Sequence, residues 1–345
     1  MDLMTYDEAL ESLQKKKRQT HLLLGNGFSM AYDTEIFSYN SLHGFIEKLD
    51  NELLTKLFEI IKTKNFELVM QQLGNFGELI DVFGTDEDLK NKVKKAHELL
   101  KHALIDAVKE LHPEHVFTIP EEKSAACANF LSYYFQGNGN IFTTNYDILL
   151  YWVLMRNALE HHVDGFGREL ENAGTFVPAD EMEFSELRWG KYKDRQNVHY
   201  LHGALPFFDT GIDIIKEEYD NSNYLLENIE ARLNNQEYPI FVTSGDGDEK
   251  LTHIMHNQYL SHCYEQLSNI EGSLITFGFN FGPSDHHIIE AINIAAKHGQ
   301  KRGDKLFSVY VGVYSEENKN YIEASAGRFQ CKVNLYDAKT ANVWG

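Results

Sequence analysis

The chain has 345 residues, of which 52 are acidic and 32 basic, so its formal net charge at pH 7 is −20. A protein this acidic repels a phosphate backbone unless its cations gather in one patch. The run Lys15-Lys16-Lys17-Arg18 is too short for such a patch, and we therefore expect no direct binding of nucleic acid.

Three cysteines, Cys127, Cys263 and Cys331, are widely spaced and form no Cys-x-x-Cys pair. This spacing supports neither a structural zinc ribbon nor a disulfide framework. No apolar run approaches the roughly 20 residues that span a bilayer, and the first residues lack the apolar core of a signal peptide. We expect a cytoplasmic protein that does not enter a membrane.

Six short apolar runs predict strands, and they lie at residues 20–24, 140–144, 198–201, 240–243, 273–277 and 306–313, with 333–336 as a candidate seventh. Several runs are apolar without alternation, which is typical of strands buried on both faces of a parallel sheet. Apolar residues at helical spacing follow in 147–159, 251–267 and 284–298. Strands that alternate with helices predict an α/β fold with a Rossmann-like doubly wound parallel sheet.

Residues 41–136 interrupt this alternation because they contain only helical patterns, such as the spacing of Leu89, Val93, Ala96 and Leu100. We therefore predict a single domain over 1–345 with a helical insertion at 42–136. Four apolar side chains of the insertion are candidates for an exposed face that mediates assembly, namely Phe45, Phe58, Phe66 and Phe76. A second stretch, 163–195, is rich in Gly, Glu and Asp and is expected to form a loop or cover.

The first run of apolar residues leads into a glycine turn, Gly25-Asn26-Gly27-Phe28-Ser29. Glycines between a strand and a helix let the backbone approach a pyrophosphate, and the N–H groups of the helix start favour its charge. The complete Gly-x-Gly-x-x-Gly pattern is absent, because Met30 stands at the third glycine position. The same glycines are equally consistent with a tight turn that binds nothing.

Polar residues follow three other predicted strands, at Thr144-Asn145-Tyr146-Asp147, at His202-Gly203, and at Gly278-Phe279-Asn280 with His286-His287 beyond it. Ligands bind beyond the carboxyl ends of strands in open α/β sheets, and a histidine there can act as a general base. The alternatives are an ordinary turn at Asn145, a helix cap at Asp147, a structural His202, and a surface pair at His286 and His287.

Taken together and in this order, the four turns resemble the sirtuin superfamily. The spellings GNGFS, TTNYD, LHG and GFNF are most similar to the sirtuin-like domains of bacterial anti-phage defence systems. The matching residues are Gly25, Gly27 and Ser29, then Thr144, Asn145 and Asp147, then His202 and Gly203, and finally Gly278. The resemblance covers roughly residues 20–30, 140–147, 198–206 and 272–290.

This resemblance implies an NAD glycohydrolase, which cleaves NAD to nicotinamide and ADP-ribose and depletes the cell of NAD during phage infection. It implies that Asp147 hydrogen-bonds the nicotinamide carboxamide, that Asn145 positions water or a ribose hydroxyl, and that His202 takes the proton. The main chain from Gly25 to Ser29, Asn26 included, would hold the pyrophosphate. The other residues expected to line the NAD site are Thr144, Gly203, Gly278, Asn280 and His287.

The chain departs from deacylating sirtuins in two respects. It lacks their four zinc cysteines, so water rather than an acyl-lysine is the expected nucleophile. It also has Phe37-Ser38-Tyr39 where sirtuins carry an arginine, which leaves that phosphate or ribose contact open. We expect no metal, because the paired histidines lack a third ligand and because Asp246 and Asp248 have too few oxygens near them in sequence for a calcium loop.

Two other functions are compatible with these residues. One is a non-catalytic module that senses NAD or ADP-ribose within a larger defence complex. The other is a protein deacylase, which the missing zinc cysteines disfavour. Three polar residues at strand ends, Asn145, Asp147 and His202, favour catalysis, because a module that only binds does not need all three. The resemblance further implies control through a homo-oligomer or through a partner such as a ring-forming HerA-like ATPase.

Overall fold

The computed structural model describes residues 3–34, 52–61, 66–84, 87–110, 112–113, 115–157, 159–171, 182–219, 223–235, 237–242, 247–297 and 305–345. A six-stranded parallel sheet forms the centre of this part of the chain. Its strands, in the order in which they lie side by side, are β11 (Lys332–Asp337), β10 (Leu306–Val313), β9 (Gly272–Phe277), β1 (Thr20–Leu24), β2 (Ile141–Thr143) and β5 (Val198–Tyr200).

The strand order identifies the sheet as Rossmann-like. Counted along the chain within this sheet, the strands lie in the order 6-5-4-1-2-3, which is the dinucleotide-binding order read from one edge. The direction of progression reverses between β1 and β9, where Leu22 pairs with Ile275. A crevice beyond the carboxyl ends of these two strands is where open α/β sheets bind their ligands.

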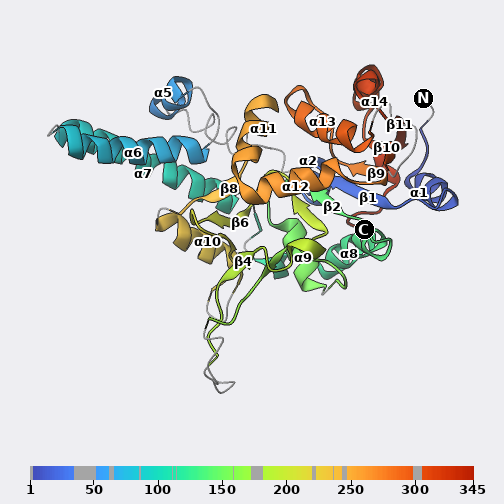
Figure 1. Cartoon of the computed structure of the whole chain (residues 1–345), viewed down its shortest axis with the longest axis horizontal. Coiled ribbons are helices and arrows are strands. Elements are labelled where there is room, and N and C mark those ends of the chain that lie inside the picture. The colour runs from blue at the N-terminus through green and yellow to red at the C-terminus, as the bar shows by residue number, and fades with distance from the viewer. Residues whose placement is uncertain are drawn as a thin grey trace.

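Helices cover both faces of this sheet, which explains why β1 is buried along its whole length and contains no polar alternation. Figure 1 shows α12 and α13 on one side of the sheet and α8 and α9 on the other. The helices in chain order are α1 (Tyr6–Lys15), α2 (Asn26–Tyr32), α5 (Glu52–Ile61), α6 (Phe66–Phe83), α7 (Glu87–Glu110), α8 (Glu121–Gln136), α9 (Leu149–Arg156), α10 (Leu225–Asn234), α11 (Gly247–His256), α12 (Gln258–Ser268), α13 (His286–Ala295) and α14 (Glu316–Ser325).

The helix predicted over 251–267 is in fact two helices. The first helix ends at His256, and the next residue, Asn257, separates it from the second. The side-chain oxygen of Asn257 accepts hydrogen bonds from the main-chain N–H groups of Tyr259 and Leu260 at 3.0 and 3.1 Å. This is an N-cap for α12, and it lets α11 and α12 take different directions. Helical periodicity continues across such a break, so the apolar pattern alone predicted one helix.

A second sheet was not predicted. It is antiparallel, and its strands in spatial order are β3 (Phe166–Gly167), β4 (Leu187–Trp189), β7 (Ile214–Lys216), β6 (Gly203–Asp209) and β8 (Pro239–Phe241). The run at 240–243 therefore belongs to this sheet and not to the parallel one. β8 is buried along its length, so its continuous apolar pattern is the same as that of a strand in the parallel sheet.

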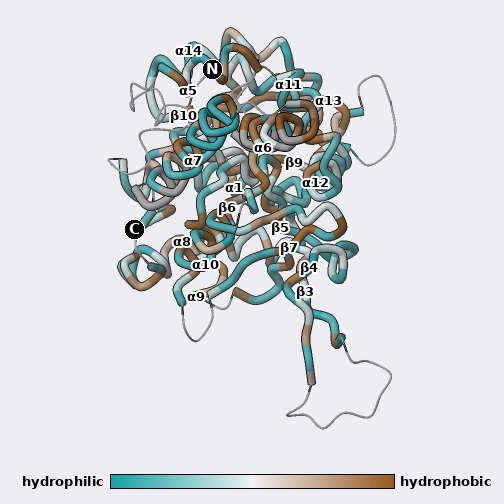
Figure 2. The backbone as a smooth tube through the Cα atoms, turned by 90° about the vertical axis from the view of Figure 1, so that its left-hand side faces the viewer, coloured by the Kyte–Doolittle hydropathy of each residue, from teal (hydrophilic) through white to brown (hydrophobic). Residues whose placement is uncertain are grey.

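The expectation of a loop over 163–195 was also wrong in part, since β3 and β4 lie within it. An isolated bridge between Leu170 and Phe184 extends this pairing. Figures 1 and 2 show that the described ends of this hairpin reach away from the two sheets. The strands are only two and three residues long. Such short strands between Gly- and Glu-rich segments show no alternation of apolar and polar residues, so the sequence pattern did not predict them.

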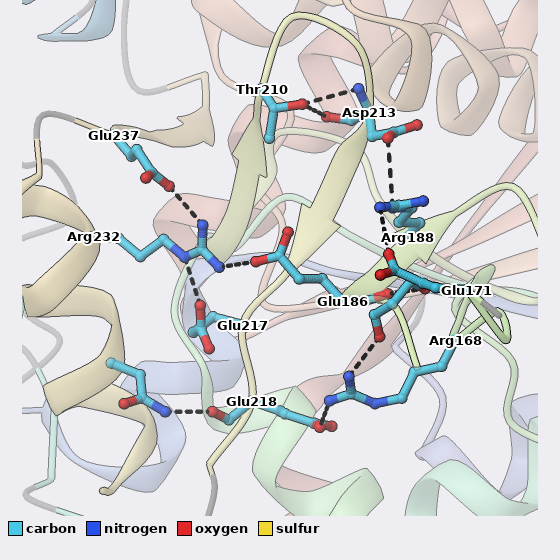
Figure 3. Close-up of polar contacts among 12 residues, drawn as sticks. Arg168, Glu171, Glu186, Arg188, Thr210, Asp213, Glu217, Glu218, Arg232 and Glu237 are labelled. Atoms are coloured by element: carbon cyan, nitrogen blue, oxygen red, sulfur yellow. Dashed lines mark hydrogen bonds and ion pairs between the residues drawn. The ribbon is translucent and has the colours of Figure 1, made fainter. Parts of the chain in front are cut away.

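Ion pairs attach α10 to the second sheet. The guanidinium of Arg232 on α10 donates to Glu217 at 2.6 Å, to Glu237 at 2.6 Å and to Glu186 at 2.5 Å, as Figure 3 shows. These carboxylates come from three separate stretches of chain, so one side chain holds them together. The same three hydrogen bonds raise the pKa of Arg232, whose partial burial acts in the opposite direction.

The described residues within 42–136 form helices and no strand, as the sequence predicts. The helices α6 and α7 pack together as a hairpin that extends away from the sheets in Figure 1. The last helix of this stretch, α8, packs instead on β1 and α9, so it serves as the crossover helix between β1 and β2. Among the described residues, the helical excursion beyond the Rossmann core thus consists of α5, α6 and α7.

No helix in the described part of the chain is both long and apolar enough to cross a membrane.

Candidate functional site

The glycine turn after β1 lies directly against the turn after β9. The N–H of Gly25 donates to the carbonyl oxygen of Phe277 at 3.0 Å, and the N–H of Gly27 donates to that of Gly278 at 2.9 Å. A Cβ atom at Gly27 would lie 2.6 Å from the Cα of Gly278, which itself has a φ of +68°. The close approach of these two turns therefore requires glycine at both positions.

This contact limits what the glycine turn offers to a ligand. The N–H groups of Gly25 and Gly27 are used as described, and that of Phe28 donates to the carbonyl oxygen of Gly25 at 2.9 Å. The N–H of Ser29 lies in the first turn of α2, where it bonds back to the N-cap residue Gly25. The expected pyrophosphate cradle from Gly25 to Ser29 therefore has at most the main-chain N–H group of Asn26. The side-chain nitrogen Nδ2 of Asn26 is buried and has no hydrogen-bond partner among the described residues, and a buried donor of this kind is normally paired.

Three predicted residues meet where β1 and β2 end. The hydroxyl of Ser29 donates to Oδ2 of Asp147 at 2.5 Å and accepts from Nδ2 of Asn145 at 2.8 Å. Local contacts fix both partners: the N–H of Asn145 donates to Oγ1 of Thr143 at 3.0 Å, and Oδ1 of Asp147 accepts from the N–H of Leu149 at 3.0 Å. The N-cap residue of α9 is Ile148, so Asp147 is not the helix cap considered as an alternative, although it bonds the first residue of that helix.

The environment of Asp147 disfavours its charge. Only 8% of the residue is exposed, and this burial raises the pKa of its carboxyl group above the ordinary value. The nearby imidazole of His112, together with hydrogen bonds from Ser29, Leu149 and Asn145, acts to lower the pKa. His112 is itself buried and lies close enough to bond the N–H of Ile148 at 3.4 Å.

Sequence reasoning missed His112 because it lies just after α7, about 35 residues before the segment after β2 that it contacts. No spacing or motif connects it to Asp147. Only the fold brings the end of the helical excursion back to the start of α9.

A second cluster forms around His202. Its Nε2 atom lies 2.9 Å from Nε2 of His287, and the two ring planes are inclined by 28° with centroids 5.2 Å apart, so the rings meet edge to edge through these nitrogens. Both residues are buried, with 4% and 0% of their surface exposed. His287 is thus no surface histidine: it lies in the first turn of α13 and points into the protein, whereas His286 contacts Asp248 at 2.9 Å.

Burial and neighbouring cations keep both rings neutral. Desolvation, His287 and Lys250 hold the pKa of His202 well below its ordinary value, and a hydrogen bond to the main chain of Thr144 opposes this effect. Desolvation, Lys250 and His286 lower the pKa of His287 to about 3. The N–H of Leu201 donates to the carbonyl oxygen of Thr143 at 2.8 Å, so His202 follows β5 directly beside the end of β2.

The remaining predicted residues do not converge in the same way. Gly203, with a φ of +75°, begins β6, and a Cβ there would lie 2.0 Å from the carbonyl oxygen of Ile240. This close contact between β6 and β8 explains why residue 203 is a glycine. Asn280 is exposed in the turn after β9, between the buried Phe279 and Phe281.

A cavity of about 490 Å³ lies beside α9, lined by aromatic side chains such as Tyr151, Trp152 and Tyr224 together with Arg156. None of the predicted site residues lines it, and we do not assign NAD to it. In the described residues no group of three or more His, Cys, Asp and Glu side chains is arranged to hold a metal ion. Asp246 lies outside the described residues.

The chain belongs to the family described as a domain of unknown function, DUF4917, whose model matches residues 22–344. No curated protein matches it in sequence. All the predicted site residues, from Gly25 to His287, lie within the matched region, so the two clusters are part of the unit that defines the family.

Proposed function

We propose that this DUF4917 member binds NAD at the carboxyl edge of its parallel sheet and hydrolyses the bond between nicotinamide and ribose. The observation that supports this most directly is the hydrogen-bonded set Ser29, Asn145 and Asp147, which lies next to His202 at the ends of the neighbouring strands β2 and β5. The set lies beyond β1 and β2 of a sheet with the dinucleotide-binding strand order.

The reaction requires the protein to position NAD and the attacking water and to accept one proton. The nicotinamide ring of NAD is cationic, so it leaves as a neutral molecule when the glycosidic bond breaks, and positive charge develops on the ribose. Asn145, held by Ser29, positions the attacking water, and the histidine pair takes its proton. Asp147 accepts a hydrogen bond from the carboxamide, because a carboxylate bonded to Ser29 and Leu149 retains further lone pairs.

Nδ2 of Asn26, which has no hydrogen-bond partner among the residues that the structure describes, supports the assignment of a dinucleotide to this edge. A buried amide donor without a partner loses hydrogen bonds that it would make in water, and a phosphate or ribose oxygen would restore one. Asn26 directly precedes Gly27, whose turn lies against Gly278 at the reversal of strand order. We therefore place the pyrophosphate against Asn26 and the nicotinamide ribose toward Asn145.

A second candidate function is a non-catalytic module that senses NAD or ADP-ribose. It is favoured by the fact that Ser29, Asn145 and Asp147 are buried and bonded to one another, as in a purely structural network. Incubation of the chain with NAD, followed by chromatography, separates these functions. Nicotinamide and ADP-ribose in equal amounts support the hydrolase, whereas unchanged NAD that nevertheless binds supports the sensor.

The resemblance to defence-associated domains extends the proposal to NAD depletion during phage infection, under the control of a homo-oligomer or a HerA-like ATPase. The helical excursion offers a surface for such assembly. Phe76, Leu79 and Phe83 on α6 are 46%, 48% and 83% exposed and share one helix face. Of the other predicted residues Phe58 is buried, and Phe45 and the side chain of Phe66 lie outside the described part.

A further inference from the structure

The contact between His202 and His287 determines where their protons can be. Two ring nitrogens 2.9 Å apart need one proton between them, because two lone pairs or two N–H groups repel at that distance. The pair is buried, and its neighbours include Lys250 and His253 on α11 and His286 on α13. Asp285 lies 3.1 Å from Nζ of Lys250 and offsets part of that positive charge.

The unpartnered nitrogen of His287 settles the direction of the shared hydrogen bond. Nδ1 of His287 is buried and has no hydrogen-bond partner among the described residues. A neutral imidazole carries one proton. On Nδ1 that N–H would be buried without an acceptor, whereas on Nε2 it lies against the ring nitrogen of His202 at 2.9 Å. His287 therefore donates from Nε2–H, and His202 has a bare Nε2 that accepts.

This arrangement leaves an acceptor without a partner. His287 carries its proton on Nε2, so its Nδ1 has a lone pair, and that atom is buried without a hydrogen-bond partner in the described part of the chain. The backbone around it is fixed, since the hydroxyl of Tyr264 on α12 donates to the carbonyl oxygen of His287 at 3.1 Å. Within the pair, Nδ1 of His287 is thus the nitrogen that remains able to accept a proton from a bound molecule.

We propose that His287 is the residue that takes the proton from the attacking water, and that His202 is its relay partner. As the oxygen of water bonds to C1′ of the ribose and the bond from C1′ to nicotinamide breaks, the proton of water passes to Nδ1 of His287. The Nε2 proton of His287 moves to Nε2 of His202. The positive charge then lies on His202, which carries protons on both Nδ1 and Nε2, and reversal of the two transfers resets the pair after product leaves.

This inference rests on the proposed NAD hydrolysis for its substrate, but its proton positions can be measured without any turnover. Two-bond ¹H–¹⁵N correlation spectra of the ¹⁵N-histidine-labelled full chain at pH 7 distinguish protonated from bare ring nitrogens. We expect His287 to be protonated at Nε2 only and His202 at Nδ1 only. A proton on Nδ1 of His287 would overturn the relay, whether or not the chain hydrolyses NAD.

Turnover provides the second test, with His287→Gln and His287→Phe compared against His286→Gln as the matched control. The glutamine amide can still donate to His202, but it cannot accept a proton and pass one on. We expect both His287 variants to lose activity by on the order of 10²–10⁴-fold in kcat with KM for NAD little changed, and the control to match the parent chain. A His287→Gln variant with parental kcat would show that His287 only orients His202, and would overturn the relay. Parent protein that leaves NAD intact would instead refute the proposed function, while the spectra still report on the pair.

Discussion

The hydroxyl of Ser29 lies 2.5 Å from Oδ2 of Asp147, and this single hydrogen bond connects the turn after β1 to the segment after β2. The same oxygen accepts from Asn145 at 2.8 Å, so Ser29 holds both residues that we place at the nicotinamide end of NAD. It is completely buried. Its role is therefore to position two other side chains.

Replacing Ser29 with alanine is expected to cost stability and activity together. The buried Asn145 and Asp147 would each lose a partner, which corresponds to about 1–3 kcal/mol for a buried group left unpaired. Urea denaturation measures this as a lower midpoint. Ser132→Ala on the exposed face of α8, where the hydroxyl only bonds a carbonyl of its own helix, is the control and should change the midpoint little. Equal midpoints for the two variants would contradict the assigned role of Ser29.

Substitutions of two glycines by alanine should have opposite effects. Gly27→Ala places a Cβ 2.6 Å from Gly278 Cα, so the turn must shift, at a cost of about 1–3 kcal/mol for overpacking. Gly74 lies within α6, and a Cβ added there would meet no described atom within 4 Å, so Gly74→Ala should stabilise the chain by about 0.5–1 kcal/mol. Thermal unfolding of both variants checks the signs, and a neutral Gly27→Ala would refute the tight contact.

Stability should fall with acid because several buried histidines resist protonation. Burial lowers the pKa of His199 to about 3, and neither of its ring nitrogens has a hydrogen-bond partner among the described residues. In the unfolded chain a histidine titrates near pH 6.5, so the unfolded state binds more protons below that pH. The stability that the neutral ring contributes is complete above about pH 6.5 and is lost as the pH falls toward 3.

His199→Phe tests this pH dependence. The ring of His199 stacks on Phe142 with centroids 4.8 Å apart, and phenylalanine can occupy that place without titrating. Between pH 7.5 and pH 5.0 the parent should lose about 2 kcal/mol more than the variant, as one histidine with a strongly lowered pKa contributes. Urea unfolding at both pH values measures the difference. An identical loss in the two proteins would argue against a buried neutral His199.

Assembly through α6 predicts a change in size when its exposed apolar face is made polar. Phe76→Ser, Leu79→Ser and Phe83→Ser together should lower the sedimentation coefficient, because the side chains that we expect to pair between subunits are removed. Serine substitutions at exposed polar positions of α7 provide the control, for example at Lys92. An unchanged coefficient would place the oligomer contact elsewhere or show that none exists.

The parallel sheet was predictable because its strands are buried on both faces. Residues 20–24 and 306–313 match β1 and β10 residue for residue, and 333–336 is confirmed within β11. The second sheet was not predictable, since β8 has the same apolar pattern and β3 and β4 are too short to show alternation. Composition does not encode which sheet a buried strand joins.

The candidate site was predictable only as a set of strand ends. The carboxyl ends of neighbouring parallel strands lie at the same edge of a sheet, so residues that follow them come close together. The proximity of Ser29, Asn145 and Asp147 could therefore be expected from the predicted sheet. The pairing of His202 with His287 did not follow, because β5 and β9 are separated by β1 and β2 in the sheet and no spacing in the chain connects them. His112 was missed for the same reason.

NAD hydrolysis at this site is best tested by the rate of nicotinamide release from NAD by the purified chain and by its Asn145→Ala and His202→Ala variants. We expect nicotinamide and ADP-ribose in equal amounts from the parent. We expect rates lower by on the order of 10²–10⁴-fold in each variant, with unfolding midpoints that show an intact fold. Near-parental release by either variant, or NAD left unchanged by the parent under conditions in which it binds, would contradict hydrolysis at this site.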